Sequence, residues 1–187
     1  MRILALILLL LVANTLTGQE IGIKAGINVS SLGKNDNGLE SKIGYLFGAV
    51  FLTPITENLE LQSELVYSLQ GAKDINISES KRNYTYLNLP VMVNVLFRDR
   101  FMLQIGGQTG LLLSGKIKDP IDNSNITNLL KRVDFAVIVG LEIDLNDRIT
   151  STLRYQFGVN NTVKASPSAT TKFQNKVLQI SMGIKFI

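Results

Sequence analysis

Charged residues set into otherwise apolar stretches are the side chains of this sequence that could do chemistry. Glu64 and Glu142 are carboxylates, and Lys24, Arg154 and Lys185 are cations, each alternating with uncharged neighbours. Two carboxylates in a shared environment can separate their pKa values and act as an acid and a base. Charges along a channel can instead guide ions, and charges withdrawn from water can pair with one another to fill space. The pattern leaves these three interpretations to be weighed.

The composition excludes several kinds of catalytic and metal-binding site. The 187 residues include no Cys and no His, which removes thiolate nucleophiles, disulfides and the commonest general base and metal ligand. The oxygen-rich stretch 119–125 lacks the spacing of a calcium loop. The net charge is +4 without a concentrated basic run, so nucleic acid is not an expected partner. We therefore expect no catalytic residue, no cofactor and no metal site.

Apolar and polar residues alternate along most of the chain with the period of a β-strand. In the stretch 176–187, for example, Leu178 and Ile180 share one face whereas Gln179 and Ser181 share the other. The alternation predicts eight strands, at 20–29, 42–53, 58–71, 84–98, 101–115, 132–144, 148–160 and 176–187. Tight turns and long polar loops alternate between them, as in up-and-down outer-membrane barrels.

The sizes of the side chains on the two faces favour a membrane barrel over a soluble one. Bulky aliphatic and aromatic residues occupy one face, and glycine, amide, hydroxyl and charged residues occupy the other. An eight-stranded barrel has a narrow interior, so the small and polar face belongs inside. The bulky apolar face then points outward, which lipid tolerates and water does not. A soluble ligand-binding barrel, with the opposite polarity, is the alternative.

The predicted fold is therefore all-β, an eight-stranded antiparallel up-and-down transmembrane β-barrel. An even number of strands places both termini at the short-turn rim, which faces the periplasm, and the long loops outside the cell. Aromatic residues near strand ends, including Tyr84 and Tyr86, are expected in the interfacial girdles of such a barrel.

The first 18 residues have the pattern of a secretory signal peptide. Arg2 precedes an apolar stretch at 3–12 that is too short to span a membrane as a helix, and smaller or polar residues follow up to Gly18. We expect cleavage after Gly18. Because Gln19 stands where a lipoprotein has Cys, no lipid anchor is expected. The chain thus divides into a cleaved signal peptide at 1–18 and an outer-membrane barrel domain at 19–187, with an uncleaved anchor helix as the alternative.

Several short segments follow one another in a characteristic order and spacing: GIKAGIN at 22–28, LQSELVYSLQG at 61–71, YLNLPV at 86–91, GGQTGLL at 106–112, RYQFG at 154–158 and GIKF at 183–186. Together they resemble the small outer-membrane barrels grouped with PorT, a porin-like family. The resemblance implies an outer-membrane barrel and, from named relatives, a link to protein secretion. Asn88 departs from the family pattern, which usually has an acidic residue there. Phe186 corresponds to the aromatic assembly signal at the end of such barrels, displaced by one residue because Ile187 follows it.

The inward charges are expected to form one network across the lumen, in which Glu64 and Glu142 pair with Arg154, Lys24 or Lys185. Amides complete the hydrogen bonds, namely Gln62, Asn94, Gln104, Gln108, Gln156 and Gln179. A network of this kind fills the lumen and plays a structural role.

The function expected from a filled lumen is that of a structural or interaction protein of the cell envelope. An accessory or assembly component of a secretion system and a narrow passive pore are the alternatives. The expected partners are outer-membrane lipid and lipopolysaccharide, the barrel-insertion machinery and other envelope or secretion proteins.

Overall fold

The computed structural model of the protein describes residues 20–32, 39–74, 81–118, 123–160 and 174–186. The expected signal peptide at 1–18 and the terminal Ile187 lie outside these residues. Within them, no helix is long and apolar enough to cross a membrane.

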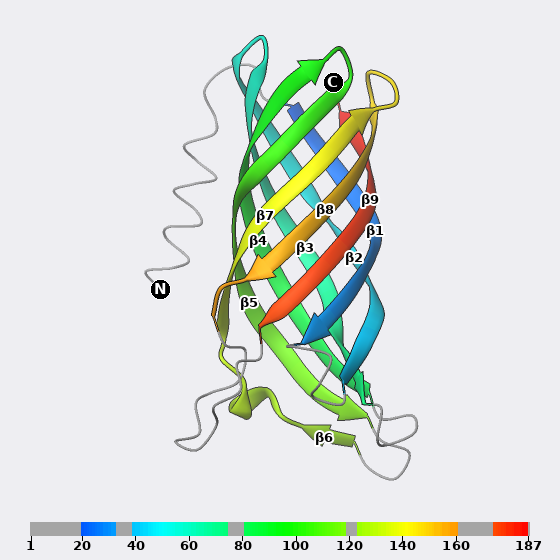
Figure 1. Ribbon diagram of the computed structural model, residues 1–187, viewed down its shortest axis with the longest axis vertical. Coiled ribbons are helices and arrows are strands. Elements are labelled where there is room, and N and C mark those ends of the chain that lie inside the picture. The colour runs from blue at the N-terminus through cyan, green and yellow to red at the C-terminus, as the bar shows by residue number, and fades with distance from the viewer. Residues whose placement is uncertain (1–19, 33–38, 75–80, 119–122, 161–173, 187) are drawn as a thin grey trace.

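Eight long strands close into an antiparallel barrel (Figure 1). They are β1 (Glu20–Leu32), β2 (Leu39–Thr56), β3 (Leu59–Asp74), β4 (Lys81–Arg98), β5 (Phe101–Lys118), β7 (Val133–Asp144), β8 (Ile149–Gly158) and β9 (Asn175–Phe186). Consecutive long strands pair with one another, and the pairing of β1 with β9 closes the barrel. The predicted fold class is confirmed.

One segment of the fold was not predicted. The stretch between β5 and β7, expected to be a long loop, contains the short strand β6 (Asn123–Asn125) and the single 3-10 turn η2 (Thr127–Leu129). β6 pairs with the end of β5. Leu130, just after η2, is buried against Tyr84 and Leu112. This segment therefore folds back over the loop-side end of the barrel.

The exposure of side chains alternates along the strands as predicted. On β9, Ile180 and Met182 are exposed, whereas Gln179 and Ser181 are buried. Two aromatic residues contradict their predicted place in an interfacial girdle, because Tyr84 and Tyr86 are only 2% and 1% exposed. Both lie on the inward face of β4.

The barrel wall is taller on one side. Strands β2 to β5 have 16 to 18 residues, whereas β1, β7, β8 and β9 have 10 to 13. The tight turns, the start of β1 and the end of β9 all lie at one rim, at the top of Figure 1. The additional residues of β2 to β5 therefore project from the opposite, loop-side rim.

Gly71 marks an irregularity in this projecting part of β3. Its φ is 145°, a conformation that residues with a Cβ rarely adopt. Ser30 Oγ accepts a hydrogen bond from the Gly71 N–H at 2.8 Å and donates one to the Gly71 carbonyl at 2.9 Å. A Cβ at this position would collide with the carbonyl oxygen of Arg82.

The Gly71→Ala variant is therefore expected to lower the free energy of unfolding by about 1–2 kcal/mol. Reversible urea unfolding in phospholipid vesicles measures the loss. Gly107→Ala is the matched control, because the nearest atom to its new Cβ would be Ala136 O at 3.9 Å. Equal stability of the two variants would contradict a strained backbone at Gly71.

Candidate functional site

Three of the predicted charges meet in the middle of the lumen. Glu64 accepts hydrogen bonds from Lys24 Nζ at 3.1 and 3.3 Å and from Arg154 Nη1 at 2.9 Å. Arg154 Nη2 also lies 2.8 Å from Glu64 Oε1, an ion contact that lacks the alignment of a hydrogen bond. All three side chains are buried. One carboxylate thus contacts two cations away from water, and we call these three residues the lumen triad.

The strand register explains how the triad assembles. Lys24, Glu64 and Arg154 lie at inward positions of β1, β3 and β8, strands that are not neighbours in the sheet. Their side chains therefore meet by crossing the lumen. Gly140 of β7 is the direct cross-strand partner of Arg154, and a Cβ there would lie 2.7 Å from Arg154 Cγ. The missing side chain at Gly140 makes room for the guanidinium stem.

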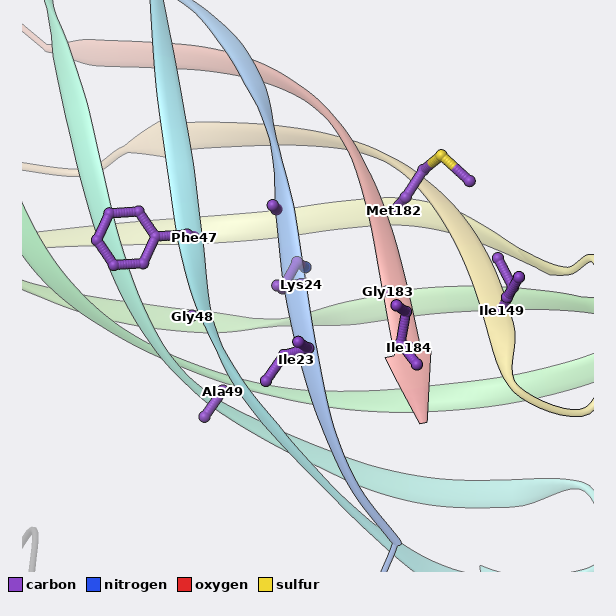
Figure 2. Close-up of a pocket in the computed structure, with 10 residues that line it drawn as sticks. Ile23, Lys24, Phe47, Gly48, Ala49, Ile149, Met182, Gly183 and Ile184 are labelled. Carbon is purple, nitrogen blue, oxygen red and sulfur yellow. The ribbon is translucent and has the colours of Figure 1, made fainter. Parts of the chain in front are cut away.

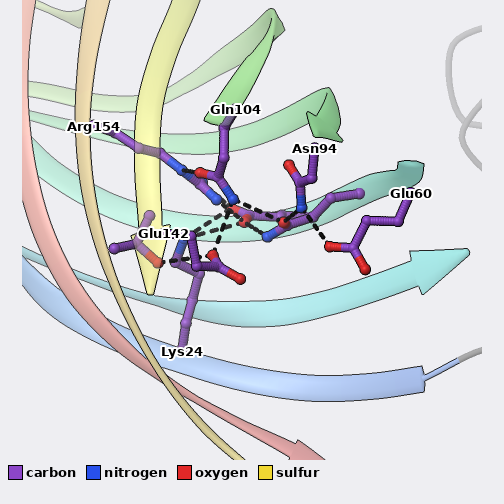
Figure 3. A network of polar contacts seen from close by, with 9 residues as sticks. Lys24, Glu60, Asn94, Gln104, Glu142 and Arg154 are labelled. Carbon is purple, nitrogen blue, oxygen red and sulfur yellow. Dashed lines mark hydrogen bonds and ion pairs between the residues drawn. The ribbon is translucent and has the colours of Figure 1, made fainter. Parts of the chain in front are cut away.

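Neutral amides extend the triad toward the tight-turn rim (Figure 3). Gln104 Oε1 accepts a hydrogen bond from Arg154 Nε at 2.6 Å, while Gln104 Nε2 donates to Gln62 Oε1 at 3.0 Å and to Glu142 Oε2 at 2.9 Å. Gln62 Nε2 in turn donates to Glu64 Oε1 at 2.6 Å. Each amide uses both its donor and its acceptor, so the charges and amides form one bonded layer across the barrel.

Asn94 of β4 joins this layer to two side chains of β3. Its Nδ2 donates to Gln62 Oε1 at 2.5 Å and to Glu60 Oε1 at 2.6 Å. Gln108 and Gln156 bond to one another instead, at 3.3 Å. Gln179 faces inward opposite Arg154.

Glu142 does not pair with a cation as predicted. It accepts hydrogen bonds from Thr152 Oγ1 and Gln104 Nε2, both at 2.9 Å. Thr152 is its direct cross-strand partner on β8, so this hydroxyl lies closer than any of the expected cations. Glu142 thus joins the layer through neutral groups.

Lys185 lies outside the layer, because its Nζ is 3.1 Å from Asp144 Oδ1 near the tight-turn rim. This pair is partly exposed to solvent. The sequence analysis did not predict Asp144 as a partner of Lys185. The alternation along β7 nevertheless places Asp144 on the same inward face as Glu142.

Among the described residues, several inward side chains bury polar atoms that lack a partner, as Asn94 Oδ1 does within the layer. Within the described part of the chain, the side chains of Tyr86, Asn88, Gln108 and Asp134 each bury a polar atom without a hydrogen-bond partner. A second set of hydrogen bonds nevertheless lies on the loop side, where Asn28 Nδ2 and Gln70 Nε2 both donate to Ser68 Oγ at 3.1 Å.

This arrangement suits a plug better than a reaction site. Glu64 and Glu142 are bridged by Arg154 and Gln104, so they do not share a proton as a catalytic pair would. Among the described residues, no group of three or more Asp, Glu, His or Cys side chains is arranged to hold a metal ion.

The outer wall carries a hollow of about 720 Å³ over β9, β1 and β2 (Figure 2). Small residues line it, since Ala25 lies between its larger cross-strand partners Phe47 and Met182, and Ala49 is the partner of Ile23. Its lining is almost wholly apolar. The hollow therefore offers no groups for catalysis or metal binding.

Comparisons with known proteins place the chain in a family. The family model of the outer membrane protein beta-barrel domain matches residues 16–164. Among solved structures, Neisserial surface protein A (NspA) has a TM-score of 0.63 at 10% identity, with 91% of this chain and 100% of that chain covered. Ail, the attachment invasion locus protein of Yersinia pestis, has a TM-score of 0.55 at the same identity and coverage.

A second Ail structure, in complex with the heparin analogue sucrose octasulfate, is similar at a TM-score of 0.53, with 10% identity and the same coverage of 91% and 100%. No curated protein sequence matched. At this identity the structural likeness shows the fold alone. The family match, however, extends over most of the chain, and the chain therefore belongs to the outer membrane protein beta-barrel domain family.

Proposed function

We propose that this protein is an integral outer-membrane barrel whose filled lumen makes it a structural or interaction protein of the cell envelope. The bonded layer around Lys24, Glu64 and Arg154 supports this function, because it crosses the lumen at the middle of the barrel. Buried charges that are already in contact with an opposite charge offer a permeating ion no free partner. The lumen then acts as a plug, and no catalytic step is assigned to it.

The proposed orientation follows from the position of the chain ends. Ile21 and Phe186 pair at the tight-turn rim, which in this proposal faces the periplasm once the signal peptide at 1–18 has been removed. The loop-side rim then lies outside the cell. Phe186 is 53% exposed on the outer face, a position suited to an assembly signal read by the insertion machinery.

Planar-bilayer recording tests the plug. The purified protein is expected to give no sustained conductance, whereas the combined variant Lys24→Ala, Glu64→Ala, Arg154→Ala is expected to conduct, because it empties the middle of the lumen. The control variant Asp144→Ala, Lys185→Ala removes the partly exposed pair near the rim and should stay silent. Sustained conductance by the unmodified protein would favour the passive pore and overturn the proposal.

An interaction role is favoured by the loop-side rim, where the tall strands project. The similar Ail structure is a complex with the heparin analogue sucrose octasulfate, so another barrel of this fold has been found with a ligand. Outer-membrane lipid and lipopolysaccharide are the partners we propose first.

An accessory role in secretion, as in PorT-like proteins, is the alternative supported by the segment resemblance described above. Unchanged export of secreted proteins after deletion of the gene would count against that alternative, and impaired export would favour it.

A further inference from the structure

Three lysines lie side by side on the outer face of the projecting strands. Lys73 of β3 is the direct cross-strand partner of Lys81 of β4, and Lys81 is the partner of Lys118 of β5. All three are exposed. Neighbouring strands are about 4.8 Å apart, so like charges stand in a short row. Like charges directly opposite one another destabilise a sheet, and a bound anion would relieve that repulsion.

The row stands just beyond the apolar belt of the barrel. Lys73 and Lys81 continue the outward alternation that includes Leu69 and Leu87. Lys73 follows Leu69 by four residues, which in a tilted strand corresponds to roughly 9 Å along the membrane normal. Outward side chains of a barrel wall project sideways, so at this height the lysines reach toward lipid headgroups.

Lys42 of β2 adds a second, independent observation. It is 7% exposed, and its Nζ has no hydrogen-bond partner within the described part of the chain. Burial disfavours its charged form, and repulsion from the three lysines of the row adds to this. A buried ammonium group without a counter-charge is unfavourable, so Lys42 and the row form a local excess of positive charge among the described residues. Glu40 lies opposite Lys73 on β2 and offsets the charge at that end of the row.

We propose that Lys73, Lys81 and Lys118 form a binding site for the phosphate groups of lipopolysaccharide. Ammonium groups bind phosphate as point charges without demanding one orientation, which suits a row of exposed lysines beside a lipid. The inference rests on the proposed function, because phosphorylated lipopolysaccharide surrounds the row only if the loop-side rim lies outside the cell.

Native mass spectrometry of the protein in a neutral detergent tests the site, with diphosphorylated lipid A and its dephosphorylated form as probes. The wild-type protein is expected to retain the diphosphorylated form preferentially. The variant Lys73→Gln, Lys81→Gln, Lys118→Gln should bind it roughly 10- to 100-fold more weakly. Glu40→Gln should bind it more tightly, because the carboxylate opposite Lys73 is removed.

The matched control is Arg98→Gln, Arg100→Gln, Arg148→Gln, which removes the same charge from exposed residues at the tight-turn rim. It should keep the wild-type affinity. Unchanged binding by the lysine variant, or an equal loss in the arginine control, would overturn the site. Binding of a heparin oligosaccharide in place of lipid A would also overturn it, in favour of a soluble polyanion.

Failure of the proposed function gives a different result. Labelling of a tag in the 145–147 turn on intact cells would show that the orientation is wrong, whatever the purified protein binds. Unaltered gel mobility on boiling would count against a closed membrane barrel, and each variant is screened for this heat shift first.

Discussion

Replacing Glu64 with Gln is expected to lower the free energy of unfolding by about 3–5 kcal/mol, the loss typical of breaking a buried ion pair from one side. The Glu64 carboxylate contacts both Lys24 and Arg154, and an amide of the same size leaves two buried cations without a counter-charge. Reversible urea unfolding in phospholipid vesicles measures the loss of free energy, with the heat-dependent shift in gel mobility as the probe of the folded barrel.

Glu142→Gln is the matched control for this experiment. Glu142 is 3% exposed, close to the 2% of Glu64, but its partners Gln104 and Thr152 are neutral donors that an amide oxygen can still accept from. We expect a loss of about 1 kcal/mol or less. Adding Lys24→Met to the Glu64→Gln variant should recover part of the stability, because one uncompensated cation is removed. Equal losses in the two single variants would contradict the triad as the centre of the network.

The direction of most side chains could be predicted from the sequence, because lipid and lumen impose a period of two on each strand wherever the pairing is free of register shifts. Ile27 and Ile180 face lipid, while Asn28 and Gln179 face the lumen, and the alternation shows this before any strand is paired. The alternation also indicates the correct direction of two residues that were predicted wrongly. Tyr84 and Tyr86 share the inward parity of Asn88, and this outweighs their position near a strand end.

The height of each side chain in the lumen could not be predicted in the same way. Alternation gives a direction, but the contacts between Glu64 and Arg154 depend on the stagger summed over all the strands between β3 and β8. Asp144 and Glu142 are two residues apart on the same face, which is about 7 Å along a strand. Because of that spacing, Lys185 forms its ion pair with Asp144 rather than with Glu142.

The segment around β6 was missed for another reason. It is too short to show a period, and Leu130 is placed by packing against Tyr84 and Leu112, residues far away in the sequence. Tertiary contacts of this kind leave no local pattern. The same limit applies to the lysine row, which exists only because the end of β3, the start of β4 and the end of β5 lie in register.

A second large effect is expected on the lipid face. Ile180 lies near the middle of β9, is 51% exposed, and has the apolar cross-strand partners Ile27 and Leu153. An Arg at the midplane of an outer-membrane barrel lowers the free energy of unfolding by about 2–4 kcal/mol, because the guanidinium must leave water for hydrocarbon. We therefore expect Ile180→Arg to lose this amount, measured by urea unfolding in phospholipid vesicles.

Depth separates this effect from a general intolerance of charge. Val159, just past the end of β8, is 60% exposed, so Val159→Arg places the same cation near the interface, where the loss should be about 0–1 kcal/mol. On a water-soluble barrel both positions would be ordinary surface, and neither Arg would matter. A large loss at Ile180 with a small one at Val159 is thus a signature of hydrocarbon around the wall. If both Arg variants were as stable as the wild-type protein, the apolar face would have to be exposed to water, and a soluble barrel would be favoured.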